Sequence, residues 1–369
     1  MAADTHATPF TGLTWEGRSV ELGEIERELN RLWREVAGTE DNPTPSRSSV
    51  LNLVVYTTSD ASAEQLNDTI GKLSGRHPLR AIVVSAEPEH QQPSLDTSLN
   101  TYCYTDPASG TTVCCEQVLV GANGEPANHL TGIVMPLLLP DLPLYLWWMG
   151  EPVYETANFT ALVRSARKLI VDSSTYLPTV QGFERLLGIA RDQQNGCTVN
   201  DLNWLRLAPW FEAVASFFDN PGMCAYLYGI EKVSLEYARQ PQDGNANPAQ
   251  PVLMAAWLYS RLGGELGHVE LQAVETDARE SGQLLSFLME TRAEGQKAEF
   301  AIRMPARGDG PANACATVGD TKVLDRPVRI GVTTHPEMLD LALESDTRDL
   351  PYEEALELAV RLLGRESGK

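Results

Sequence analysis

A short basic segment is the first place in this chain whose side chains could bind a ligand. Arg76, His77 and Arg80 stand directly before a predicted strand, within the sequence Arg-His-Pro-Leu-Arg. Two guanidinium groups this close together could hold a phosphate or a carboxylate through bidentate hydrogen bonds. The simpler alternative, which we favour, is a solvated loop anchored by Pro78. Asp172 ends a later predicted strand, at the edge where open α/β sheets bind ligands, and it could instead cap the turn that follows.

Three of the six cysteines lie close together in the sequence. Cys114 and Cys115 are neighbours, and Cys103 lies eleven residues before Cys114. They can be small buried hydrophobic residues on a strand, which is the interpretation we favour. The alternative is a redox-responsive cluster in which Cys103 approaches the pair across a hairpin turn. Zinc binding is the weakest option, because no histidine stands at ligand spacing.

Two aromatic blocks distinguish the middle of the chain. The block at 136–152 places Trp147 and Trp148 side by side in an apolar run, and the block at 201–211 carries Trp204, Arg206 and Trp210. Strand alternation in the first block and helical spacing after the second are usual for core residues. Trp and Arg are also enriched at the centres of protein interfaces. We therefore predict that the exposed members of these groups contact another protein.

The motifs of several enzyme classes are absent from the sequence. A dinucleotide site requires G-x-G-x-x-G after the first strand, whereas the residues that follow Tyr56, at 57–60, contain no glycine. The P-loop, the G-x-S-x-G nucleophile elbow and the H-E-x-x-H metal motif do not occur either. The sequence therefore predicts a protein that is not an enzyme, with no catalytic residues, no metal and no cofactor.

Charge and composition narrow the range of partners. The formal charge is −21, from 29 basic and 50 acidic side chains. Because nucleic acid and anionic lipid surfaces are bound by Lys and Arg, we expect neither nucleic acid nor a membrane as a partner. The charge can serve solubility alone, or it can steer the chain towards a basic patch on a partner. The N-terminus has no signal-peptide pattern, and Asp141 and three prolines interrupt the apolar run at 130–149, so we predict a cytoplasmic protein.

The order of predicted elements indicates an α/β domain with an open, mostly parallel sheet covered by helices. An amphipathic helix over 20–37 comes first. Predicted strands over 50–56, 80–85, 111–120, 144–148 and 168–172 then alternate with predicted helices over 60–74, 126–138, 159–167 and 178–192. A crossover of this length between the first two strands implies that they pair in parallel.

Beyond Pro221 the pattern changes to strands in succession. We predict strands over 226–237, 268–273, 283–291 and 298–303, the last three linked by hairpins, and helices over 251–263 and 352–363. Such an order is typical of a smaller α+β domain with an antiparallel sheet. We therefore divide the chain into an N-terminal helical segment at 1–44, an α/β domain at 45–222 and an α+β domain at 223–369.

With these segments in view, the chain resembles the glucose-6-phosphate dehydrogenase assembly protein family (OpcA), known from cyanobacteria and actinobacteria. The matching segments are 47–57, 76–84, 136–152, 171–176 and 201–221. In order and spacing they cover most of residues 45–222, and the double-tryptophan segment is quite specific. Residues 226–369 match by their pattern of strands more than by any motif.

The resemblance implies a non-enzymatic partner of glucose-6-phosphate dehydrogenase. Such a protein promotes the oligomeric assembly or the active conformation of the enzyme and so supports the oxidative pentose phosphate pathway. Cyanobacterial members are associated with redox control through cysteines, but no regulatory pair aligns with Cys103, Cys114 and Cys115. The family supplies no catalytic residues to carry over to this sequence.

Two other classes of function remain open at this point. A sugar-phosphate-binding or sugar-phosphate-modifying enzyme would require Arg76, His77, Arg80 and Asp172 to converge in one pocket. A ligand-sensing module would bind a metabolite with no partner present.

Overall fold

The chain forms two compact units that interleave in sequence. The computed structural model describes residues 10–17, 22–37, 46–47, 49–58, 60–74, 76–105, 112–192, 194, 196–243, 246–263, 265, 267–308, 310–331 and 334–366. Unit 1 consists of Met1–Val171, Gln193–Asn200 and Thr334–Thr347, and unit 2 consists of Asp172–Asp192, Asp201–Thr333 and Arg348–Lys369. This division does not coincide with the boundary expected at 222. Asp172–Asp192 and the residues from Asp201 to 222 belong to unit 2, and Thr334–Thr347 belongs to unit 1.

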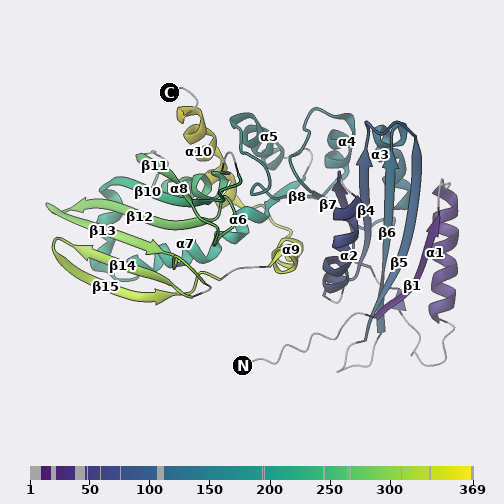
Figure 1. The fold of residues 1–369 in the computed structure, drawn as a ribbon, viewed down its shortest axis with the longest axis horizontal. Helices are drawn as coiled ribbons and strands as arrows, with labels where there is room; N and C mark the ends of the chain where they lie inside the picture. Colours follow the sequence, from purple (N-terminus) through teal and green to yellow (C-terminus); the bar gives the residue numbers. More distant parts are fainter. Residues whose placement is uncertain are drawn as a thin grey trace. The chain divides into compact units, whose positions relative to one another are not determined.

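Unit 1 is built on a nine-stranded sheet, sheet A, with the order β1-β5-β6-β4-β3-β7-β8-β9 and β2 paired to β6 (Figure 1). The strands are β1 (Phe10–Gly17), β2 (Ser46–Arg47), β3 (Leu51–Thr57), β4 (Leu79–Glu87), β5 (Ser94–Thr105), β6 (Thr112–Asn123), β7 (Leu144–Trp148), β8 (Lys168–Val171) and β9 (Thr198–Asp201). The strands β6, β4, β3, β7 and β8 are parallel neighbours. The predicted parallel pairing of the first two strands is therefore confirmed.

The helices of unit 1 follow the predicted pattern except over 126–138 and except over 335–344, where no helix was predicted. They are α1 (Leu22–Ala37), α2 (Asp60–Ser74), η1 (Glu125–His129), α3 (Leu130–Val134), η2 (Met135–Leu137), α4 (Ala157–Ser165) and α9 (His335–Glu344). The single helix expected over 126–138 is three short helical segments. The second of them, α3, ends just before Pro136, which has no backbone N–H with which to continue an α-helix. The helix α4 begins where the Thr156 hydroxyl accepts the backbone N–H of Phe159 at 3.2 Å.

Unit 2 is built on a six-stranded sheet, sheet B, with the order β11-β10-β12-β13-β14-β15 (Figure 1). The strands are β10 (Ile230–Arg239), β11 (His268–Glu275), β12 (Leu284–Ala293), β13 (Gln296–Arg303), β14 (Ala312–Val318) and β15 (Thr321–Val328). All neighbours are antiparallel except β10 and β11, which are parallel. The predicted hairpin between 268–273 and the next strand is therefore wrong, because a helix between β10 and β11 returns the chain for parallel pairing.

Helices cover one face of sheet B. The helices of unit 2 are α5 (Val180–Arg191), α6 (Leu202–Arg206), α7 (Ala208–Ala215), η3 (Ser216–Phe218), η4 (Pro221–Tyr228), α8 (Ala249–Arg261) and α10 (Leu350–Glu366). The helix α8 contacts β10 and β11, and α10 packs on α8 and α5. Phe217 and Phe218 place their rings 5.4 and 5.0 Å from the ring of Phe300 on β13. The core of unit 2 thus lies between these helices and the Phe300 face of the sheet.

Candidate functional site

The strand order of sheet A places a change of direction between β3 and β7. Open α/β sheets bind ligands in the crevice at such a point, beyond the carboxyl ends of the strands. Here Tyr56, next to the last residue of β3, stacks on Trp148, the last residue of β7, with 3.7 Å between the ring centroids. Phe159 of α4 meets Trp148 edge-on at 5.0 Å. The protein's own aromatic rings therefore fill this end of the crevice.

The two adjacent tryptophans point to opposite faces of sheet A, as strand alternation requires. Trp148 meets Phe159 on one face, and Trp147 lies 5.9 Å from His335, the first residue of α9. The exposed fractions of Trp147 and Trp148 are 1% and 2%. The prediction that an exposed member of this pair contacts a partner is wrong, because both indoles are part of the core.

The second aromatic group is also internal to its unit. Trp204 and Trp210 are buried, and the indole N–H of Trp204 donates a hydrogen bond to Asp349 at 2.9 Å. Arg206 donates two hydrogen bonds to Asp172, at 2.7 and 2.6 Å. The residues predicted to bind a partner are thus occupied by contacts within unit 2.

Asp172 is held in a turn at the end of β8. Its side chain accepts from the backbone N–H and the hydroxyl of Ser174, at 3.1 and 2.6 Å, so the alternative prediction of a turn cap is confirmed. Burial alone would raise the pKa of Asp172, but the hydrogen bonds and the charge of Arg206 outweigh it and lower the pKa below its ordinary value. Asp172 is therefore an ionised member of a buried ion pair.

A second buried carboxyl, Asp201, lies close to this pair. It accepts the backbone N–H groups of Ser173 and Asn203 at 3.0 and 2.9 Å. Burial, followed by the negative charge of Asp172, raises the pKa of Asp201 to about 6. The side-chain amides of Asn203 and Gln250 extend this network, with distances of 3.0 Å from Asn203 to the Ser173 hydroxyl and from Gln250 to Asn203. These groups fix three separate stretches of unit 2 to one another.

The possible anion site at Arg76, His77 and Arg80 is not formed. Arg76 and His77 both bind Asp340 of α9, and the His77 Nε2 to Asp340 Oδ1 distance is 2.8 Å. Arg80 is 1% exposed and donates to Glu116 at 2.7 Å, to a second carboxylate on α1 and to a backbone carbonyl. Each cation is neutralised inside unit 1, so none is free to hold a phosphate. The loop interpretation that we favoured fits the exposed Arg76 but not Arg80.

Lys168 is a buried lysine, of the kind often found at functional sites, and sequence reasoning did not single it out. It is fully buried at the start of β8, and its ammonium donates to the backbone carbonyls of Ala342 and Ser345, at the end of α9. The ammonium also lies 4.6 Å from the ring centroid of Tyr145. Burial lowers the pKa of Lys168 to about 8. Its hydrogen bonds go to carbonyl groups left open at a helix C-terminus, which identifies it as the group that holds α9 on unit 1.

The structure brings two of the three clustered cysteines together. Cys103 on β5 and Cys114 on β6 are directly opposite each other and form a disulfide. Cys115 is a free thiol, and burial raises its pKa. The interpretation as unmodified buried hydrophobic residues therefore fits Cys115, whereas the other two cysteines are cross-linked.

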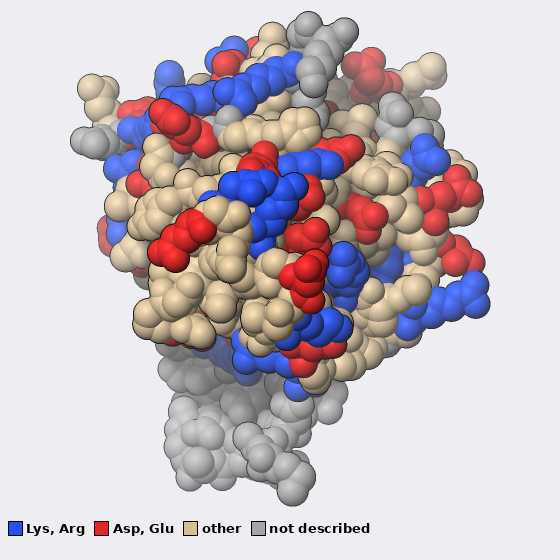
Figure 2. Space-filling view, turned by 90° about the vertical axis from the view of Figure 1, so that its left-hand side faces the viewer, with Lys and Arg blue, Asp and Glu red and all other residues tan. Residues whose placement is uncertain are grey.

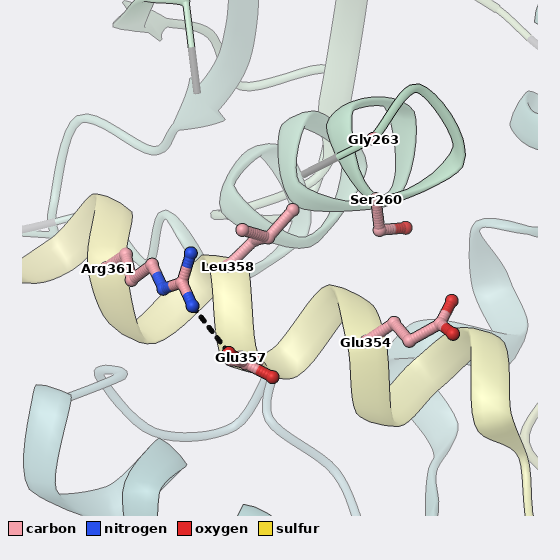
Figure 3. A pocket seen from close by; sticks show the side chains of 6 residues that line it. All are labelled: Ser260, Gly263, Glu354, Glu357, Leu358 and Arg361. Carbon is pink, nitrogen blue, oxygen red and sulfur yellow. Dashed lines mark hydrogen bonds and ion pairs between the residues drawn. The ribbon is translucent and has the colours of Figure 1, made fainter. Parts of the chain in front are cut away.

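A pocket with a volume of about 400 Å³ lies between α8 and α10 (Figure 3). Its lining consists of Ser260, Gly263, Glu354, Glu357, Leu358 and Arg361. Glu357 pairs with Arg361 at 2.5 Å, and Glu354 pairs with Arg261. The charged groups are therefore bound to one another, and among the described residues that line the pocket no nucleophile has a neighbouring base.

Two family models match the chain. One, described as the glucose-6-phosphate dehydrogenase subunit N-terminal domain, matches residues 71–187. The other, described as the C-terminal domain of the same subunit, matches residues 197–356. The chain belongs to the OpcA family. Membership extends over residues 226–356, which the sequence motifs alone did not connect to OpcA.

Relatives named OpcA occur in cyanobacteria. The "Putative OxPP cycle protein OpcA" of Synechocystis sp. is 30% identical over 204 residues, which are 55% of this chain and 40% of that protein. The protein of the same name from Nostoc punctiforme is 30% identical over 191 residues, 51% of this chain and 38% of that protein. The matched part of the chain thus spans less than half the length of these OpcA relatives.

Two solved structures of oxidoreductases match the chain weakly. A mutant of KijD10, a 3-ketoreductase from Actinomadura kijaniata, matches with a TM-score of 0.45 and 12% identity, over 85% of this chain and 96% of that chain. A levoglucosan dehydrogenase matches with a TM-score of 0.42 and 11% identity, over 86% of this chain and 97% of that chain. At this level of similarity, neither structure carries information about the function of an OpcA protein.

The segments that identify the OpcA family are mainly core segments. Residues 47–57 contain β3, residues 136–152 contain β7, and residues 201–221 contain α6 and α7. Strand β3 is buried on both faces along almost all of its length, and β7 is buried throughout. These motifs are therefore diagnostic of the fold, and the surface of the OpcA protein has to be found from the structure.

The most exposed large hydrophobic side chain among the described residues is that of Tyr228, at 86%. It ends η4, whose other tyrosine, Tyr226, is buried. The next residue, Gly229, lies so close to β12 that an added Cβ would be 1.8 Å from the carbonyl oxygen of Arg292. This close approach requires glycine and fixes the chain at the corner where Tyr228 projects. Sequence reasoning missed Tyr228, because neither its exposure nor the close approach at Gly229 can be seen before the chain is folded.

Charge is distributed rather than concentrated on the side of the molecule shown in Figure 2. Lys and Arg side chains alternate there with Asp and Glu, and large uncharged areas lie between them (Figure 2). The net charge of −21 thus produces no single acidic face in this view. Among the helices that the structure describes, none offers the length of apolar sequence that a membrane crossing needs.

Proposed function

We propose that this chain binds glucose-6-phosphate dehydrogenase and promotes its active oligomeric state, without being an enzyme itself. The observation that carries the proposal is the match of both units to domains described as parts of a glucose-6-phosphate dehydrogenase subunit, over 71–187 and 197–356. The name of the cyanobacterial relatives refers to the OxPP cycle, which agrees with a role in oxidative pentose phosphate metabolism.

The pairing of the charged side chains supports a role in binding another protein rather than in catalysis. Arg206 is paired with Asp172, Arg80 with Glu116, and His77 with Asp340. The aromatic stack of Tyr56 and Trp148 closes the end of sheet A where an α/β enzyme would bind its cofactor. Groups that could have formed an active site therefore contribute to the fold.

Activation by binding requires a difference in affinity between two states of the dehydrogenase. A partner that bound both states equally would shift nothing. A tenfold to hundredfold activation corresponds to about 1.4–2.8 kcal/mol of differential binding. One or two well-placed aromatic residues can supply this amount. Because the four tryptophans of the aromatic blocks are buried, we assign this role to the exposed Tyr228.

The test is a titration of the purified chain into glucose-6-phosphate dehydrogenase from the same organism. We expect the rate of the dehydrogenase to rise and saturate, and light scattering after size-exclusion chromatography to show a complex of larger mass. Separate elution at micromolar concentration with unchanged kinetics would contradict the proposal. The chain alone, incubated with glucose 6-phosphate and a nicotinamide cofactor, is the control for the enzyme alternative, and turnover in that control would favour it.

Two finer expectations belong to this proposal. The complex is expected in the cytoplasm, which cell fractionation checks. Reduction of the Cys103–Cys114 disulfide by a dithiol, which supplies two electrons and two protons and leaves two thiols, is expected to change the activation. Equal activation by the oxidised and reduced forms would remove redox regulation from the proposal while leaving the binding intact.

A further inference from the structure

The two faces of sheet B differ in how they are covered. Phe300 on β13 points to the face where the rings of η3 lie. Because side chains alternate along a strand, Glu299, Ala301 and Arg303 point to the opposite face. Glu299 and Arg303 are exposed, so this face of β13 is open to solvent in the single chain. We refer to it as the open face of sheet B.

A neutral row of side chains crosses the middle of the open face. Strand register places Ser234 on β10 opposite Leu288 on β12, Leu288 opposite Ala301 on β13, and Ala301 opposite Cys315 on β14. None of the four carries a charge, and Ala301 is 5% exposed. The row is uncharged, and the centre of an interface is depleted of charged side chains.

Charges of opposite sign flank this neutral row on two of the strands. On β10, Lys232 and Glu236 stand two residues to either side of Ser234. On β13, Glu299 and Arg303 stand two residues to either side of Ala301. Neither Glu299 nor Arg303 has an ion-pair partner among the residues that the structure describes.

This pattern is complementary to itself. Two copies can be stacked about a twofold axis that lies between their open faces. If this axis runs across the strands, over the neutral row, each strand lies on the same strand of the second copy and runs in the opposite direction. Glu299 then faces Arg303 of the second copy, and Lys232 faces Glu236 of the second copy. An axis that runs along β13 would instead place Glu299 and Arg303 each over its own copy, which costs energy. The charges thus select one of the two simple ways of stacking the sheets.

The intermediate strands agree with the same arrangement. On β12, Glu290 faces the uncharged Ser286 of the second copy, and on β14, Thr317 faces Asn313 of the second copy. The edge strands place Glu270 and Asp325 level with the neutral row. Each of these carboxylates already pairs with a lysine in its own sheet, Lys232 or Lys322, so the edge strands form the polar rim.

We propose that the open face of sheet B is an isologous interface between two copies of this chain. Six strands about 4.8 Å apart, each about eight residues long, span roughly 29 by 26 Å, or about 750 Å². This area approaches the roughly 800 Å² that each partner buries in an interface of standard size. The reciprocal contact of Glu299 with Arg303 occurs twice in such a dimer.

Sedimentation velocity of the full chain, from about 1 to about 100 µM, tests the proposal. We expect a dimer for the wild type and a dissociation constant raised at least roughly tenfold by either Arg303→Glu or Glu299→Arg, since each places like charges opposite one another twice. The double variant, Glu299→Arg with Arg303→Glu, restores the opposite charges and should return to within about threefold of the wild type. Arg164→Glu, on exposed α4 of unit 1, makes the same charge change elsewhere and should have no effect.

Two results would overturn the proposal. The first is a monomeric wild type at every concentration; if Arg303→Glu then also weakens the complex with the dehydrogenase, the open face belongs to that partner. The second is a double variant as weakly associated as the single ones. A short bis-maleimide provides an independent check, because it should join two chains through Cys315 and fail with Cys315→Ser, while Cys224→Ser, the control at another partly exposed cysteine, should still cross-link.

Discussion

Sheet A and sheet B differ in which of their faces are buried. Sheet A is buried on both faces along β3 and β7, and its ligand-binding end is closed by the stack of Tyr56 on Trp148. Sheet B is covered on its Phe300 side and open on the Ala301 side. The difference shows that sheet A uses both faces of its central strands for the core of unit 1, whereas sheet B leaves one face available for association. The following experiments examine this comparison in order of expected effect on stability.

Replacing the stacked indole should destabilise unit 1 more than any surface change. Trp148→Ala removes a ring that is 2% exposed and leaves a cavity, which costs about 3–5 kcal/mol. Trp148→Phe keeps an aromatic ring against Tyr56 and should cost less. Urea unfolding measures both variants. If Trp148→Ala had the stability of the wild type, the crevice would not be closed by packing as described.

Replacing the two arginines of the basic segment should lower the free energy of unfolding by very different amounts. Arg80→Met leaves Glu116, which is 2% exposed, without its buried partner, and we expect a loss of about 3 kcal/mol or more. Arg76→Met removes an exposed arginine from Asp340, which keeps His77, so a loss of about 0–1 kcal/mol is expected. The same unfolding assay compares them. Equal effects would mean that Arg80 is not the buried anchor of the pair.

The pH dependence of stability should carry the signature of Asp201. Its folded-state pKa of about 6 lies above the ordinary value of 3.8, so the folded chain holds the proton more tightly. The resulting stabilisation is fully present below pH 3.8 and is lost as the pH rises through about 6. Asp201→Asn, which keeps the acceptor for Ser173 and Asn203, should abolish this slope, worth about 1–3 kcal/mol.

The control for that experiment is an exposed carboxylate. Asp325→Asn on β15 should leave the slope between pH 4 and pH 6 as it is in the wild type, because its side chain is solvated and paired with Lys322. A slope that survives in Asp201→Asn would assign the titration to another group.

Replacing Tyr228 should change stability least of all these variants but should weaken partner binding strongly. Tyr228→Ala removes a side chain that is 86% exposed, so the free energy of unfolding should change by less than about 0.5 kcal/mol. The complex with glucose-6-phosphate dehydrogenase should weaken by roughly thirtyfold, as for an interface residue worth about 2 kcal/mol. Full activation by this variant would move the contact away from η4.

Much of the fold follows from local patterns that the sequence displays. The apolar run at 50–56 predicted a strand buried on both faces, which is β3, Leu51–Thr57, and the helix predicted over 60–74 coincides with α2. Strand β5, Ser94–Thr105, was missed because it is rich in polar residues and lacks the apolar run that marks β3. The helix α9 was missed although its start is marked in the sequence by the capping-box pair Thr334 and Glu337.

The candidate site was less predictable, since its residues are defined by partners far away in the chain. Arg76 appeared free to hold an anion, but its carboxylate, Asp340, stands 264 residues later. The tryptophans were correctly singled out by type, yet type does not distinguish a core indole from one at an interface. The open face of sheet B depends on the registers of four strands, and register is a property of the folded sheet.

Because α9 is part of unit 1, this unit cannot be completed until most of the chain has been synthesised. A ribosome delivers unit 1 in order until residue 171, but the piece that supplies Asp340 and the carbonyl acceptors of Lys168 emerges only after residue 333. A fragment that stops before Thr334 would therefore carry a buried ammonium with nothing to bind. We expect this fragment, expressed alone, to aggregate. Co-expression of a peptide spanning 334–347 should restore soluble protein.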